Sequence, residues 1–140
     1  MRRFTQLYAE LDRTTKTNAK LAALVRYFTE TPPADAAWGL LFISGHTLPR
    51  GISSTALRDW IAEESGYPAW LIDESYSEVG DLAEAAALLL PDAPSRSDAP
   101  LHALVETRLL PLRDLPLEQR RELLVRTWRE LDAEQRLVWN

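Results

Sequence analysis

Residues Ser75 to Pro91 read SYSEVGDLAEAAALLLP and contain the junction around which the other helices are expected to pack. Gly80 can adopt the left-handed backbone conformation that ends one helix, and Asp81 suits the N-cap of the next. Glu84 stands three residues after Asp81, where a capping-box acid reaches back. Because alanine lets neighbouring helices approach closely, the sequence predicts that this helix lies at the centre of an all-helical domain. The simplest interpretation of the Gly-Asp junction is an architectural one.

The composition indicates one globular domain with a real core, since the chain has 140 residues of which 46% are apolar. It contains no cysteine, which excludes disulfides and cysteine-ligated metals. Its two histidines, His46 and His102, lie far apart in sequence. No run approaches the roughly 18 uninterrupted apolar residues of a membrane span. We therefore expect a cytoplasmic protein without a membrane segment.

The net charge of −5 is unevenly distributed. Residues 1–58 hold eight Lys/Arg and four acids, residues 59–106 hold one Arg and eleven acids, and residues 107–140 hold seven Arg and six acids. A positive end on an acidic body can bind a polyanion with one face only. Unevenly placed solvating charge is the alternative explanation.

Apolar residues recur at helical spacing in about eight segments, and no strand alternation is apparent. The first helix is indicated by the stripe Phe4, Leu7, Tyr8 and Leu11, and the second by Leu21, Leu24, Val25 and Phe28. A third, from Pro33 to Gly45, is almost wholly apolar, so we expect it to be buried on most sides. These segments predict an all-α fold without a sheet.

The second half of the chain continues this pattern. Ser53 or Ser54 is expected to cap a helix that stops at Gly66, and Pro68 to open the helix that leads into Gly80. Residues 91–100 are predicted to form a surface loop, followed by a helix that ends before Pro111 and another that opens at Pro116.

A last helical segment begins at Asp132, where Gln135 completes the pattern of a capping box. It continues for only about two turns before the sequence ends, and isolated helices of that length gain little by themselves. We therefore expect residues 1–140 to be a single all-helical domain that is incomplete at its C-terminal end.

No catalytic motif is visible. The sequence has no Gly-rich phosphate loop, serine elbow, His-Glu-x-x-His or Lys-x-Asp-Gly. Adjacent acids such as Glu63-Glu64 and Asp73-Glu74 diverge on a helix, so neither pair converges on one point. We expect no catalytic residue, metal site or cofactor in this chain.

The strongest candidate site is the segment around residues 14–20, which gathers hydroxyls, an amide and both lysines at a helix start. Free backbone N–H groups and the positive end of the helix dipole favour a phosphate there. The alternative is capping of the helix by Thr17 or Asn18, which can coexist with phosphate contact. The candidate DNA-contacting residues of this segment are Thr15, Lys16, Thr17, Asn18 and Lys20.

A second candidate is the loop from His46 to Ser54, where a cation precedes another hydroxyl-capped helix start. Its candidate residues are His46, Arg50, Ser53 and Ser54. Two helix starts with flexible cations suit a surface that grips a phosphate backbone without reading bases.

Several motifs spread along the chain resemble one known family. They are Phe4-x-x-Leu7-Tyr8-x-x-Leu11-Asp12, Thr15-Lys16-Thr17-Asn18-Ala19-Lys20, Ala37-Trp38-x-Leu40-x-Phe42-x-Ser44-Gly45, Leu57-Arg58-Asp59-Trp60, Gly80-Asp81-Leu82-Ala83-Glu84 and the stretch Asp132–Asn140. Together they resemble the N-terminal DNA-binding domain of bacterial ATP-dependent DNA ligases. The resemblance covers essentially the whole chain.

The resemblance implies an all-helical domain that sits on the minor groove of duplex DNA around a nick, mainly through backbone contacts, in DNA replication, repair and recombination. The parent enzyme would use ATP and Mg²⁺. Neither Lys16 nor Lys20 lies in the Lys-x-Asp-Gly motif of the adenylated lysine, and a further Gly- and Arg-containing helical segment of the family is missing. We therefore expect most of a DNA-binding domain, acting as a monomer, without the catalytic domains and without ligation by itself.

Two other functional classes remain open from the sequence. The chain could be an all-helical protein–protein interaction module whose exposed aromatic residues dock a partner. It could also be a helix-turn-helix regulator whose recognition helix reads the major groove. The second is disfavoured because the candidate contacts sit at helix starts and loops rather than on a basic helix face.

Overall fold

The fold is that of a computed structural model, which describes residues 1–93 and 97–140. All regular secondary structure in these residues is helical, so the predicted all-α class is confirmed. The predicted surface loop at 91–100 falls partly on residues 94–96, which lie outside the described residues. The chain forms two compact units, Met1–Leu48 with Asp98–Leu110 and Pro49–Ser97 with Pro111–Asn140. We call them the first and the second unit.

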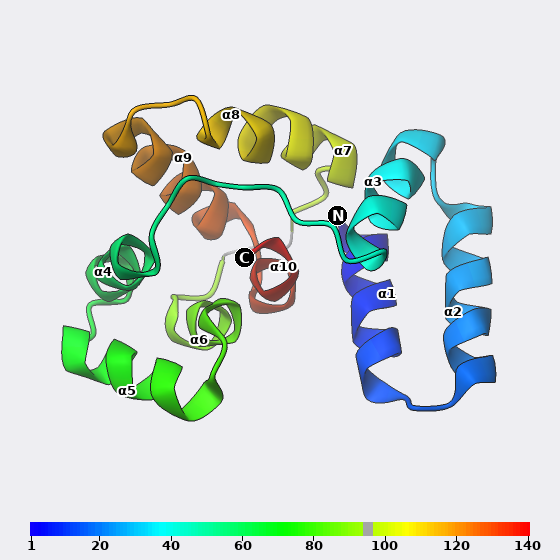
Figure 1. The fold of residues 1–140 in the computed structure, drawn as a ribbon, viewed down its shortest axis with the longest axis horizontal. Helices are drawn as coiled ribbons and strands as arrows, with labels where there is room; N and C mark the ends of the chain where they lie inside the picture. Colours follow the sequence, from blue (N-terminus) through cyan, green and yellow to red (C-terminus); the bar gives the residue numbers. More distant parts are fainter. Residues whose placement is uncertain (94–96) are drawn as a thin grey trace. The chain divides into compact units, whose positions relative to one another are not determined.

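The first unit is built on an antiparallel hairpin of two helices (Figure 1). Its elements are α1 (Arg2–Arg13), α2 (Thr17–Glu30), α3 (Pro33–Ile43), α7 (Leu101–Leu104) and a π-helical turn (Val105–Leu109). Aromatic contacts join α1, α2 and α3. The centre of the Phe4 ring lies 6.1 Å from the centre of the Tyr27 ring and 6.0 Å from that of the Phe42 ring.

The inner face of α2 is not formed by the apolar residues that indicate the helix. Its buried residues are Ala23 and Tyr27, whereas Leu21 and Val25 are 57% and 58% exposed. Small Ala23 lets α1 come close, and the Tyr27 hydroxyl donates to the Asp35 carbonyl at 3.2 Å. The spacing of Leu21, Leu24, Val25 and Phe28 predicts the helix itself, whereas its buried face depends on a tyrosine that finds a partner on another helix.

The third helix is also less buried than predicted. Gly39 is its one buried residue, and Leu40 is 58% exposed. A Cβ at Gly39 would stand 2.4 Å from the Tyr27 hydroxyl, so α3 approaches α2 along this glycine. The Gly39 side of α3 is therefore covered while Leu40 faces solvent, which an apolar pattern alone could not show.

The helix predicted to end before Pro111 continues through it. The π turn Val105–Leu109 is followed directly by α8 (Leu110–Leu112), and the Leu110 amide donates to the Val105 carbonyl. A proline inside a helix removes one backbone hydrogen bond and collides with the carbonyl four residues earlier. Here the wider π turn lies immediately before Pro111, where an ordinary helical turn would meet that collision.

The second unit is organised around the alanine-rich helix, as the sequence predicts. It contains α4 (Ser54–Ser65), α5 (Ala69–Val79), α6 (Leu82–Leu89), α9 (Leu117–Glu130) and α10 (Ala133–Trp139). Helix α6 contacts α4, α5 and α10 (Figure 1). Its Ala85 and Ala86 have almost no exposed surface, so the close approach expected of alanine occurs.

The junctions of the second unit also follow the sequence. Gly80 has a φ of 77° and ends α5 in the left-handed conformation. The Asp81 carboxylate accepts hydrogen bonds from the amides of Ala83 and Glu84 at 2.7 and 3.1 Å. Asp132 and Gln135 form the predicted capping box of α10. Each of these features is set by residues adjacent in sequence.

A completely buried arginine holds the inner end of α10. Arg136 donates to the carbonyls of Leu131 at 2.7 Å, Leu90 at 3.0 Å and Pro91 at 2.5 Å, and its exposure is 0%. Burial lowers the pKa of its guanidinium. The carbonyls belong to the C-terminal ends of α6 and α9, where the helix dipole is negative and a cation is stabilising. Arg136 therefore provides hydrogen-bond donors to the carbonyls at the C-terminal ends of both helices.

Candidate nucleic-acid interface

The turn between α1 and α2 is the exposed cationic segment of the first unit. Arg13 is the last residue of α1, and Lys16 is the N-cap of α2. The residues Thr15, Lys16, Thr17, Asn18 and Lys20 are all exposed. Thus the structure brings the five predicted contact residues of this segment together with Arg13 on one accessible turn.

The start of α2 has no side-chain cap. The Lys16 amide donates to the Thr14 hydroxyl at 3.2 Å, and the Lys16 carbonyl accepts from the amides of Ala19 and Lys20. Neither Thr17 nor Asn18 provides the capping that the sequence offered as the alternative. The first amides of a helix have no partner within the helix itself. They are therefore available to an anion at this position.

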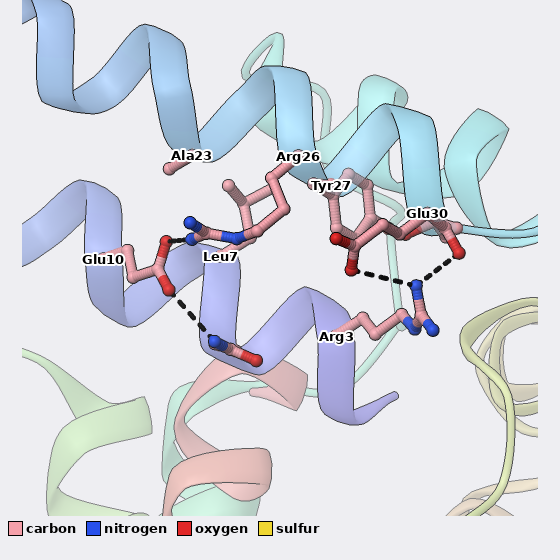
Figure 2. Close-up of a pocket in the computed structure, with 9 residues that line it drawn as sticks. Arg3, Leu7, Glu10, Ala23, Arg26, Tyr27 and Glu30 are labelled. Atoms are coloured by element: carbon pink, nitrogen blue, oxygen red, sulfur yellow. Dashed lines mark hydrogen bonds and ion pairs between the residues drawn. The ribbon is translucent and has the colours of Figure 1, made fainter.

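Ion pairing separates the cations of the hairpin into two groups. Figure 2 shows Arg26 paired with Glu10 and Arg3 paired with Glu30 in the seam between α1 and α2. By contrast, Arg13, Lys16 and Lys20 make no ion pair with any residue that the structure describes. The seam neutralises its acids, while the turn keeps its positive charge.

The turn carries one acid of its own, Asp12, within residues 11–20. With three cations and one acid the turn remains net positive.

The second candidate segment lacks such a surplus of free charge. His46 lies in the first unit, exposed, with its Nδ1 2.9 Å from the Ser44 hydroxyl oxygen. It therefore has a local partner.

The start of α4 is capped by its own residues. The Ser53 hydroxyl accepts from the Ala56 amide at 3.1 Å, and Ser54 is the exposed first residue of the helix. Ser53 therefore uses its hydroxyl as an N-cap, the role that serine most often takes at this position.

Arg50 is directed toward the C-terminal end of α10. Its Nη2 donates to the Trp139 carbonyl at 3.1 Å and also to the Asn140 carbonyl. Burial lowers the pKa of its guanidinium. The indole of Trp128 donates to the Asn140 side chain at 2.9 Å from the other side. To reach a phosphate, Arg50 would have to leave these carbonyls.

One known protein family matches nearly the whole length of the chain. Residues 1–139 match the family described as DNA ligase N terminus. The chain belongs to this family. No curated protein and no solved structure matches the chain.

The predicted resemblance to the N-terminal part of a DNA ligase is thereby confirmed. Within this DNA ligase domain, the contact residues predicted in the first unit form one cluster with Arg13, and His46 belongs to the same unit. Arg50, Ser53 and Ser54 belong to the second unit. Each unit therefore carries its own part of the predicted interface.

Arg13 is not among the contact residues predicted from the sequence, because it ends the first helix and does not belong to the hydroxyl-rich start of the second. The signal was available: Arg13, Lys16 and Lys20 follow one another within eight residues that contain no acid. Arginine in the last turn also interacts favourably with the negative end of the α1 dipole. Its position at the turn of the ligase domain adds a third cation to the two lysines.

Among the described residues, no three His, Cys, Asp or Glu side chains are grouped to hold a metal, and no helix is long and apolar enough to cross a membrane. A cavity of about 230 Å³ in the first unit is lined by Arg2, Thr31, Asp35, Asp98 and other residues. Arg2 and Asp98 pair there at 2.6 Å, so their charges offset each other.

Proposed function

We propose that this chain grips duplex DNA around a nick for an ATP-dependent DNA ligase, through contacts with the phosphate backbone along the minor groove and without reading sequence. Membership of the DNA ligase N-terminal family supports the assignment of this chain to such an enzyme. The observation that carries the DNA grip is the cluster of Arg13, Lys16 and Lys20, which form no ion pair with a described residue, beside an uncapped helix start.

The physical argument rests on what each group can recognise. The first-turn amides of α2 and the positive end of its dipole bind an anion. Lysine ammonium groups act as point charges on flexible stems, and each neutralised phosphate releases counterions from the duplex. None of these interactions distinguishes one base pair from another, because base edges are read only in the grooves. The result is affinity for DNA that does not depend on its sequence.

The second segment is proposed as a supporting contact. His46 and Ser54 are exposed and can reach a backbone oxygen as they stand. The hydroxyl of Ser53 is occupied by the Ala56 amide, and the guanidinium of Arg50 by two carbonyls. We therefore assign the larger share of phosphate contact to residues Thr15–Lys20.

ATP and Mg²⁺ are assigned to other parts of the parent enzyme. Adenylation needs a lysine held against the α-phosphate of ATP, with cations balancing the developing charge. Lys16 and Lys20 are exposed on a helix start, so this chain's lysines do not fit that role. Incubation with ATP and Mg²⁺ should leave the mass of the chain unchanged. A stable AMP adduct on either lysine would contradict this division of labour.

The grip is tested by measuring binding of the chain to nicked, intact and single-stranded DNA of two unrelated sequences, each at several salt concentrations. We expect equal affinity for the two sequences, a preference for nicked duplex, and a linear fall of log affinity with log salt. Strong dependence on sequence would favour the helix-turn-helix alternative. Equal affinity for single-stranded and nicked DNA would contradict a grip on the duplex.

A further inference from the structure

The outer face of α5 presents an exposed tryptophan beside acids that pair with no residue described in the structure. Trp70 is 68% exposed, and Ile72, on the opposite side of the helix, is completely buried. Glu74 and Glu78 follow Trp70 at successive intervals of four residues, which places them in one row along the helix. We call Trp70, Glu74 and Glu78 the α5 row. Tyr67, 47% exposed, precedes it.

The charge of this face is not balanced within the described residues. Helix α5 carries three acids and no basic residue. Asp73 pairs with Arg58 at 2.7 Å, whereas Glu74 and Glu78 make no ion pair with a described residue. Two acids of α4, by contrast, are paired: Glu63 with Arg121 at 2.6 Å and Glu64 with Arg129 at 2.7 Å. The row is therefore an acidic surface with an aromatic ring at one end.

Helix α5 already binds one arginine with the same combination of groups. The guanidinium of Arg58 lies 5.8 Å from the centre of the Tyr76 ring and pairs with Asp73. A cation over an aromatic ring is stabilised by the ring quadrupole, most strongly for tryptophan. Trp70 and Glu74 offer a ring and a carboxylate on the outer face, where no described cation occupies them.

We propose that the α5 row binds a Lys/Arg-rich segment of a protein partner. Residues four apart on a helix are separated by about 6 Å along its axis. Side chains two apart on an extended strand are separated by about 6.6 Å and point to the same side. A partner segment with a basic residue at every second position would thus place successive cations over Trp70, Glu74 and Glu78.

The charge of the face argues against DNA as its occupant. Two unpaired carboxylates repel a phosphate backbone, and like charges brought together at an interface disfavour the wrong partner. Basic protein segments experience the opposite effect. Aromatic residues such as tryptophan are also enriched where a few residues dominate binding between proteins. The inference is independent of the DNA grip, since it concerns another surface and another partner.

The experiment uses the full chain and a fluorescein-labelled peptide in which lysine and alanine alternate, followed by anisotropy. Two variants remove the proposed contacts: Trp70→Ala, and Glu74→Gln together with Glu78→Gln. Each has a matched control. Leu88→Ala removes a comparably exposed apolar side chain (69%) from α6. Glu118→Gln together with Glu122→Gln removes two exposed acids with the same spacing from α9.

We expect each variant of the row to weaken peptide binding by about fivefold, at the upper end of an exposed cation–π contact for Trp70 and of exposed ion pairs for the two glutamates. The controls should stay within about twofold of wild type. All altered residues are exposed, so the melting temperature should not change. Failure of the wild type to bind the peptide would overturn the proposal. Equal losses in the α9 control would do the same, because attraction would then depend on total charge alone.

A last arm uses nicked duplex DNA in place of the peptide. Trp70→Ala should bind it as wild type does. If this variant loses DNA affinity instead, the tryptophan stacks on nucleic acid and the assignment to a protein partner is wrong. This outcome is distinguishable from failure of the DNA grip itself, in which the wild type would not bind the duplex at all.

Discussion

The starts of helices α2 and α4 look alike in sequence and differ in structure. Both combine hydroxyl residues with a nearby cation, Lys16 in one case and Arg50 in the other. At α4 the Ser53 hydroxyl caps the helix, and Arg50 holds the carbonyls that end α10. At α2 no side chain caps the helix, and Lys16 has no ion pair with a described residue. Only the first helix start keeps its groups free for a ligand.

The difference shows that a basic residue near a helix start is not by itself a DNA contact. Among the described residues of the second unit, Arg50, Arg120 and Arg136 hold backbone carbonyls. Arg120 donates to the carbonyls of Leu115 at 2.7 Å and Arg113 at 2.9 Å, and Arg136 does so in the core. Arginine suits this role because its planar fork donates in several directions at once. Lysine, with one flexible head, is less suited to it.

The largest effect should come from the most buried of these arginines. Replacing Arg136 by methionine fills much of its volume but leaves the buried carbonyls of Leu90 and Leu131 without this donor, each costing about 1–3 kcal/mol, while the more exposed Pro91 carbonyl can turn to water. The buried charge is also removed, which offsets part of the loss. We expect the free energy of unfolding to fall by about 3 kcal/mol, measured by urea denaturation. Arg126→Ala, at an exposed position of α9, is the control and should change it by less than about 0.5 kcal/mol.

An Arg136→Met variant as stable as wild type would show that the three carbonyls find other donors or water. The distinction between arginines that hold the backbone and cations that face solvent would then lose its strongest case. A mild loss shared equally by Arg126→Ala would have the same meaning.

The next largest effect concerns DNA affinity. Each phosphate contact contributes about 0.9 to the slope of log affinity against log salt. Two contacts therefore account for a roughly 60-fold factor in the binding constant at 0.1 M salt. Lys16→Ala with Lys20→Ala should therefore weaken binding by that order and flatten the slope by about 1.8. The loss should be equal for all DNA sequences, and the melting temperature should stay at the wild-type value.

Two controls sharpen this result. Lys16→Arg with Lys20→Arg keeps both charges and should retain most of the affinity. Arg113→Ala with Arg126→Ala removes the same charge from exposed positions of the second unit. If that pair lowers affinity and slope as much as the lysine pair, the turn between α1 and α2 is not the main contact.

Arg50→Ala should have a somewhat smaller effect, and on stability rather than on DNA. Hydrogen bonds made by a charged donor are worth about 1.5–3 kcal/mol each, but Arg50 lies at the edge of the unit, where water can replace part of the loss. We expect a loss of about 2 kcal/mol in the free energy of unfolding, with DNA affinity near wild type once the chain is folded. The opposite result, unchanged stability with weaker DNA binding, would place Arg50 with Lys16 and remove the difference between the two helix starts.

The sequence predicted those parts of the fold that neighbouring residues determine. The Gly80 turn, the Asp81 cap and the capping box of Asp132 with Gln135 depend on residues within four positions of each other, and all three are present. Helix existence and the central place of α6 follow from apolar spacing and alanine content in the same way.

What could not be predicted depends on residues far apart in sequence. The inner face of α2 is decided by the bond from Tyr27 to Asp35 and by the close approach of Gly39. The engagement of Arg50 is decided by α10, which lies 89 residues further along the chain. Local charge and hydroxyl content identified both helix starts as candidates, and only the packing shows which of them has free groups.

The smallest predicted effect is also the most direct test of that distinction. Ser53→Ala removes the acceptor of the Ala56 amide and should cost about 1 kcal/mol, the usual loss for an N-cap serine. Asn18→Ala at the start of α2 should cost almost nothing, because no side chain caps that helix and Asn18 is exposed. Parallel thermal melts of the two variants measure this difference. If Asn18→Ala were as destabilising as Ser53→Ala, the α2 start would be capped in solution. Its amides would then already be satisfied, and the case for a phosphate at this turn would rest on Arg13 and the two lysines alone.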